Sequence, residues 1–140
     1  MRIIEWTASH AVSVPEVDDE HQEVFLLCGK LQRAAADRAP HSEIQGLLDE
    51  VVIHTAKHFA HEEREMRATG YSHYEWHKRQ HQTARSRVQG LARRVRQGDS
   101  EAANELAAFL SGWLNDHVRL ADRMLGAYLR NYQRRQPLTR

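Results

Sequence analysis

The first residues of this sequence that suggest chemistry are His58 and Glu62, which stand four positions apart. Residues at i and i+4 share a helix face, so this imidazole and this carboxylate would point in the same direction. The same spacing separates His77 from His81. Most such pairs are ordinary neighbours on a solvated helix surface, so their meaning depends on whether other segments supply partners.

Three more donors lie in otherwise apolar stretches. His21 shares a helical stripe with apolar residues, and His117 is followed five positions later by Asp122. A neutral polar group buried without a partner costs on the order of 2 to 7 kcal/mol, so this many buried donors need a counter-charge. A metal supplies it, and seven donors suit two ions better than one. The candidate metal ligands are His21, His58, Glu62, His77, His81, His117 and Asp122.

The chemical type of these donors narrows the choice of metal. They offer imidazole nitrogens and carboxylate oxygens, and the single cysteine, Cys28, is not among them. A structural zinc site usually includes thiolates, so the set favours iron. A bundle filled with structural zinc remains the plain alternative, which metal analysis distinguishes.

Four helical segments carry the donors, and short loops separate them. We expect the first helix to begin near Asp18 as its N-cap, and later helices to stop at Gly70 and Gly98, with Asp99 or Ser100 capping the last. Helices of this length with short loops predict an all-α fold, an up-down-up-down antiparallel four-helix bundle. The expected organisation is a single domain over 1–140, with an extended N-terminal arm over 1–17, the bundle over 18–132 and a basic, frayed tail over 133–140.

The spacing of His117 and Asp122 conflicts with a regular helix. Each residue turns an α-helix by about 100°, so residues at i and i+5 lie about 140° apart. Both side chains can face one site only if the helix widens between them. We therefore predict a π-bulge in the fourth helix.

Composition excludes several classes of function. The formal net charge is +1, which gives no strong field for nucleic acid or an anionic membrane. No segment approaches the roughly 20 apolar residues of a membrane span, and no signal peptide is recognisable. We expect a cytoplasmic monomer. The unusual count is histidine, with ten in 140 residues.

The combined motifs resemble the hemerythrin family, and most closely its single-domain bacterial members. They are HFAHEE from residue 58, H-x-x-x-H at 77 and 81, H-x-x-x-x-D at 117 and 122, and VDDEH before them. The resemblance spans the chain from Trp6 to about Tyr132. Where the family often has glutamine before the first ligand histidine, tyrosine four residues before the second, and an aromatic three residues after the second histidine of the third helix, this chain has Glu20, His54 and Ala84.

The resemblance implies a non-haem di-iron centre that binds dioxygen reversibly. His77, His81 and His117 would hold one iron, and His21 and His58 the other. Glu62 and Asp122 would bridge the two ions, together with an oxo or hydroxo group. The second iron would keep one open position for dioxygen, under a dry pocket lined by Phe59, Trp113, Leu114 and Val118.

Several alternatives remain open at this stage. The function would be oxygen carriage, storage or delivery to an oxygen-consuming partner protein, and not catalysis. A di-iron enzyme acting on peroxide or nitric oxide is the runner-up, although no glutamate is followed three residues later by histidine, as ferritin-like sites require. An oxygen or redox sensor is the third class. For the remaining histidines we expect surface or loop places at 10, 41, 61 and 73, and a place at the rim of the site for His54.

Overall fold

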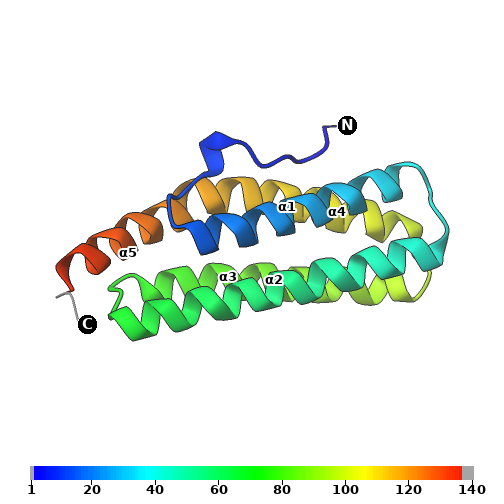
Figure 1. Cartoon of the computed structure of the whole chain (residues 1–140). Helices are drawn as coiled ribbons and strands as arrows, with labels where there is room; N and C mark the ends of the chain where they lie inside the picture. Colours follow the sequence, from blue (N-terminus) through cyan, green and yellow to red (C-terminus); the bar gives the residue numbers. More distant parts are fainter. Residues whose placement is uncertain (1, 137–140) are drawn as a thin grey trace.

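The computed structural model describes residues 2–136 and has the predicted architecture. Four antiparallel rods form the bundle, and all regular structure in this range is helical (Figure 1). Each rod packs against two neighbours, in the cyclic order that an up-down-up-down connection produces. The first three rods are α1 (Pro15–Ala36), α2 (His41–Thr69) and α3 (Tyr74–Arg96); the fourth consists of α4 (Ser100–His117), η2 (Val118–Asp122) and α5 (Arg123–Arg135).

The fourth rod contains the predicted π-bulge. The segment η2 is a π-helix, and it begins directly after His117 and ends at Asp122. The wider turn adds one residue to the helix without stopping it, since the flanking residues keep right-handed helical angles. His117 and Asp122 therefore both face the interior, although five positions separate them.

Two helix ends follow the expected signals, and the start of α1 does not. Gly70 ends α2 in the left-handed conformation with φ 70°, and the Asp99 side chain caps α4 by accepting from the amides of Glu101 and Ala102. Asp18, however, is not an N-cap, because α1 already begins at Pro15. Its carboxylate instead accepts from the amides of Val12 and Ser13, at 2.8 and 3.1 Å, and so fixes the loop before the helix.

The C-terminal end of the fourth rod also differs from expectation. Helix α5 continues to Arg135, so the first residues of the expected frayed tail are helical. Residues 137–140 lie outside the described range. No helix within residues 2–136 combines the length and the hydropathy needed to cross a bilayer.

The N-terminal arm packs along the outside of α1 and α4 (Figure 1). Its backbone is tied to α1 where the amide of Ile4 donates to the Gln32 side chain at 2.7 Å. His10 was expected at the surface or in a loop, and this was wrong: it ends the short 3-10 helix Ala8–His10 and is buried. Its Nε2–H donates to the Asn115 side chain at 2.9 Å, and its Nδ1 accepts from the Thr7 amide, which joins the arm to α4.

The apolar core is divided into two clusters along the bundle. The larger cluster includes Phe25, Leu48, Leu106 and Leu110, and fills the half that contains the α1–α2 and α3–α4 loops. The smaller cluster joins the arm, the end of α2 and α5, with Val12, Val14, Val17, Met66, Tyr71, Leu125 and Leu129. Six of the seven candidate ligands occupy sequence positions between these clusters, and His117 directly precedes Val118, the last residue of the larger cluster. The ligands therefore form a polar layer between two apolar ones.

Candidate metal centre

All seven predicted ligands converge inside the bundle, although they come from four different rods. Each is buried, with relative exposures between 0% and 5%. The spacing explains the convergence locally, since His58 with Glu62 and His77 with His81 lie one turn apart on α2 and α3. The π-helix provides the corresponding alignment of His117 and Asp122.

The ligand atoms form two groups that share both carboxylates. One group contains Glu62, Asp122 and three imidazoles, and the other contains Glu62, Asp122 and two. Within each group, all potential ligand atoms lie within 4.8 Å of one another. The three imidazoles of the first group belong to His77, His81 and His117, and the two of the second to His21 and His58.

Each carboxylate divides its two oxygens between the groups. Oε1 of Glu62 lies 3.3 Å from His77 Nε2 and 3.1 Å from His81 Nε2, whereas its Oε2 lies 3.1 Å from His58 Nε2. Oδ1 of Asp122 lies 3.0 Å from His77 Nε2 and 3.1 Å from His117 Nε2, and its Oδ2 lies 2.9 Å from His21 Nε2. This division is what a pair of bridging carboxylates requires.

These separations fit shared metal ions better than hydrogen bonds. Several N···O distances are short enough for hydrogen bonds, yet the angles are wrong, and none of the five Nε2 atoms has a hydrogen-bond partner among the described residues. Both Glu62 oxygens and Oδ1 of Asp122 are also unpaired within that range. Two donors at right angles, each about 2.1 Å from one ion, would lie about 3.0 Å apart, as these atoms do.

Hydrogen bonds on the far side of the rings orient three of the imidazoles. Nδ1–H of His58 donates to Glu20 at 2.7 Å, that of His81 to Glu63 at 2.8 Å, and that of His117 to the Gln80 side chain at 2.8 Å. A proton on Nδ1 leaves the lone pair of Nε2 free for a metal. Glu63 and Gln80 were not anticipated, although each is next to a predicted ligand in the sequence. Each accepts from an imidazole on a different rod, and local spacing does not relate residues on different rods.

The buried charges strongly perturb one another. Burial alone would raise the pKa values of Glu62 and Asp122, but the surrounding imidazoles hold both well below the usual range. Burial would lower the pKa of His58, whereas Glu62 and Glu20 raise it to about 10. Burial opposes the same change at His77, and Asp122 with Glu62 raises its pKa to about 9. With these pKa values, His58 and His77 each carry a second ring proton at neutral pH when no metal is bound. Metal binding must displace that proton.

The four residues expected to line the oxygen pocket lie next to the cluster. Leu114 and Val118 are buried in the larger apolar cluster. Phe59 stacks on His81 with ring centroids 4.0 Å apart, and Trp113 stacks on His117 at 4.2 Å. These rings cover imidazoles of the three-histidine group and shield them from solvent. Their role towards dioxygen stays a prediction.

The other histidines take no direct part in the cluster. His54 is half-exposed and lies 3.2 Å from Glu50 on the surface of α2, so it belongs to neither ligand group. His41 and His73 stand at helix starts and are exposed, as expected. His61 is only partly exposed, and its Nδ1–H donates to Glu20 at 2.9 and 3.0 Å.

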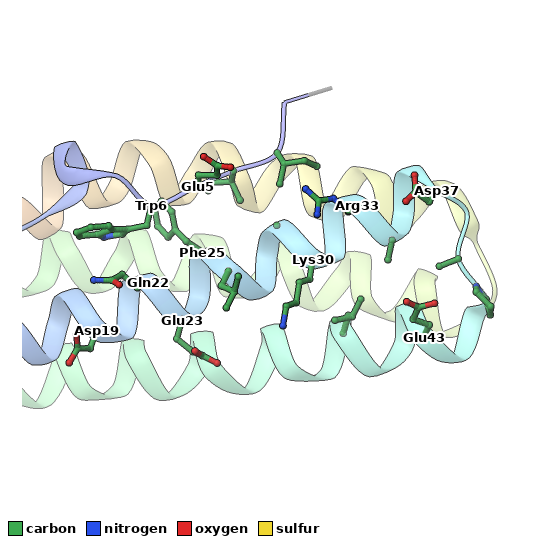
Figure 2. Close-up of a pocket in the computed structure, with 18 residues that line it drawn as sticks. Glu5, Trp6, Asp19, Gln22, Glu23, Phe25, Lys30, Arg33, Asp37 and Glu43 are labelled. Atoms are coloured by element: carbon green, nitrogen blue, oxygen red, sulfur yellow. The ribbon is translucent and has the colours of Figure 1, made fainter.

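One surface hollow, of about 560 Å³, reaches the ligand cluster, because Gln80, Trp113 and the candidate ligand His117 help to line it. A groove of about 1170 Å³ runs along α1 between the arm and α2 (Figure 2). It is lined by charges of both signs, including Glu23, Lys30 and Arg33, and by none of the seven ligands. Its charged lining is typical of a solvated surface channel. The chemistry that the residues support is instead concentrated in the buried polar layer.

A comparison with known families agrees with this geometry. Residues 12–129 match the sequence profile of the family described as "Hemerythrin HHE cation binding domain". The chain belongs to the hemerythrin family. Its match covers all seven candidate ligands and all four rods, so the predicted fold and family are confirmed.

Individual hemerythrins show the same relationship. The chain is 30% identical over 130 residues to a bacteriohemerythrin of Methylococcus capsulatus, covering 92% of this chain and 98% of that protein. It is 28% identical over 117 residues to a myohemerythrin of Riftia pachyptila, covering 84% and 86%. The crystal structure of a wild-type hemerythrin superposes with a TM-score of 0.83 at 29% identity, covering 90% of this chain and 97% of that one.

Proposed function

We propose that this hemerythrin binds dioxygen reversibly at a non-haem di-iron centre. The observation that carries the proposal is the unequal division of five imidazoles around two shared carboxylates. With both carboxylates and a solvent-derived group, the three imidazoles of one group would give its metal ion one donor more than the two imidazoles of the other. One position for a small ligand would then remain open on the side of His21 and His58. When bound, the iron pair would supply the electrons that reversible dioxygen binding requires.

The residues of the chain would favour binding over catalysis. Five neutral imidazoles and two carboxylates make a centre with fewer negative donors than a carboxylate-rich site, which disfavours cleavage of the O–O bond. Phe59, Leu114 and Val118 are almost fully buried, and Trp113 covers His117. These side chains would limit the entry of water and protons to the bound gas.

Absorption spectroscopy with iron quantitation tests this function directly. We expect two irons per chain and visible charge-transfer bands that appear in air and disappear reversibly after deoxygenation. Zinc in place of iron, or one ion per chain, would overturn the proposal. Rapid turnover of peroxide or nitric oxide by the same preparation would support an enzyme instead.

A further inference from the structure

Glu20 is a charged residue whose position the oxygen-binding proposal leaves unexplained. It precedes His21 on α1 but faces α2, where its carboxylate meets two imidazoles. Oε1 accepts from His58 at 2.7 Å, and both oxygens accept from His61, at 2.9 and 3.0 Å. His58 and His61 lie three positions apart on one face of α2, so one carboxylate reaches both rings.

The Glu20 carboxylate is held between two imidazoles that differ in exposure. Its side chain is 37% exposed and that of His61 is 22% exposed, whereas that of His58 is 4% exposed. The network therefore leads from the rim of the bundle to a buried candidate ligand. His61 holds the carboxylate from the solvent side.

The other oriented imidazoles show what distinguishes Glu20. His117 donates to the neutral amide of Gln80 at 2.8 Å, so geometry alone does not require a charged acceptor. His81 donates to Glu63, but His81 belongs to the three-histidine group. On the two-histidine side, Nδ1 of His21 has no partner within residues 2–136. Glu20 is thus the charged acceptor behind the side where the open position is proposed.

We infer that Glu20 is a positioning residue that, through His58, sets the reduction potential and the oxygen affinity of the two-histidine iron site. A carboxylate that accepts from the far nitrogen of an imidazole makes that imidazole a stronger donor. A stronger donor favours the oxidised form of the site, which lowers the reduction potential. Because dioxygen binding draws electrons from the site, the same effect tightens dioxygen binding. This inference rests on the proposed function.

The substitution Glu20→Gln separates charge from position. The amide oxygen can still accept from His58, as Gln80 does from His117, so orientation is kept while the charge is lost. We expect a higher midpoint potential for the iron pair, dioxygen dissociation about 10-fold faster, and iron affinity reduced about 10- to 100-fold in chelator competition. Anaerobic redox titration, stopped-flow absorption and the chelator assay measure the three effects.

Glu65→Gln is the matched control for the lost charge. Glu65 lies on the same helix face, 3.9 Å from His61 Nε2, and its side chain is 46% exposed. Within residues 2–136, its carboxylate forms no ion pair with any of the five candidate ligand histidines. The substitution Glu65→Gln should leave the midpoint potential of the iron pair and the rate of dioxygen dissociation unchanged. If both substitutions shift the potential equally, or if Glu20→Gln shifts neither quantity, the inference is wrong.

The role of His61 is tested in the background of the first variant. If His61 acts only through the Glu20 carboxylate, the double variant Glu20→Gln/His61→Gln should have the potential of Glu20→Gln alone. A further shift would show that His61 acts by another route. These measurements need iron but not reversible oxygenation, so a failure of the proposed function appears as a wild-type protein with a measurable potential and no reversible oxygen spectrum.

Discussion

At the scale of single residues, Glu62 and Asp122 organise the site. Each carboxylate directs one oxygen to the three-histidine group and the other to the two-histidine group. An imidazole can fill only one position on one ion, so loss of a single histidine should affect one side more than the other. Loss of either carboxylate would affect both.

The distinction between ligand and bystander histidines can be measured with two variants. His77→Ala should reduce iron well below two per chain and abolish the reversible visible bands, because it removes a buried donor from the three-histidine group. His54→Ala removes the same chemical group from the surface of α2 and should retain the wild-type iron content. Equal iron loss in both variants, by metal analysis, would contradict the assignment.

The protective role proposed for Leu114 has its own control. Leu114→Ala should shorten the lifetime of the oxygenated form several-fold, because the cavity admits water next to the site. Leu110→Ala creates a similar cavity one turn earlier in the same apolar cluster. Both should cost about 2 to 5 kcal/mol in the free energy of unfolding. Only the first should accelerate the decay of the oxygenated absorption, and equal decay rates would refute the protective role.

At the scale of elements, the fourth rod and the arm control how the site is assembled. The π-helix η2 supplies one extra residue, which brings Asp122 into line with His117. The arm then covers the rod on its outer side. At Gly126 of α5 the two approach so closely that an added Cβ would lie 2.8 Å from the carbonyl oxygen of Val12.

This close approach predicts opposite effects of one substitution at two glycines. Gly126→Ala should destabilise the protein by about 1 to 3 kcal/mol, because the arm must move away at Val12. Gly112→Ala, on an exposed and open part of α4, should stabilise it by up to about 1 kcal/mol through helix propensity. Chemical denaturation measures both. Equal signs would show that the contact between arm and helix is unimportant.

At the scale of the whole molecule, a charged layer separates two apolar clusters. Without a metal, the raised pKa values of His58 and His77 and the lowered pKa of Glu62 favour protonated imidazoles beside an ionised carboxylate in this layer. Iron would replace those protons as the counter-charge. Because the layer includes all four rods, we expect metal binding to be coupled to the stability of the entire bundle.

The pH dependence of stability follows from this exchange. His58 and His77 have folded-state pKa values of about 10 and 9, above an unfolded value of about 6.5. Their stabilising contribution is complete below the unfolded value and is lost as pH rises through the folded values. The melting temperature of iron-free protein should therefore fall between roughly pH 7 and 10.

Thermal unfolding of matched iron-free and iron-loaded samples provides the comparison. The loaded protein should melt at a higher temperature, since a ligand present at about 1,000 times its dissociation constant adds about 4 kcal/mol. It should also show a weaker decline in alkaline solution, because its imidazoles hold no such protons. Parallel pH profiles for the two forms would show that protons and metal do not compete for this layer.

The sequence by itself determined the four helices, their antiparallel order and the donors that share a face. These follow from local rules: the i, i+4 spacing of His58 with Glu62, the stop at Gly70, and the mismatch at His117 and Asp122 that requires a wider turn. The resemblance to the hemerythrin family also depends on short motifs, such as HFAHEE from residue 58. Each of these features depends on residues that are close in the chain.

Only the tertiary structure decided which side chains meet across the bundle. It placed Glu20 between His58 and His61, set Gln80 behind His117, and buried His10 against Asn115. These partners lie 37 to 105 positions apart, so no helical period relates them. Their pairing depends on the rotation of each rod about its own axis, which the packing of both apolar clusters fixes collectively.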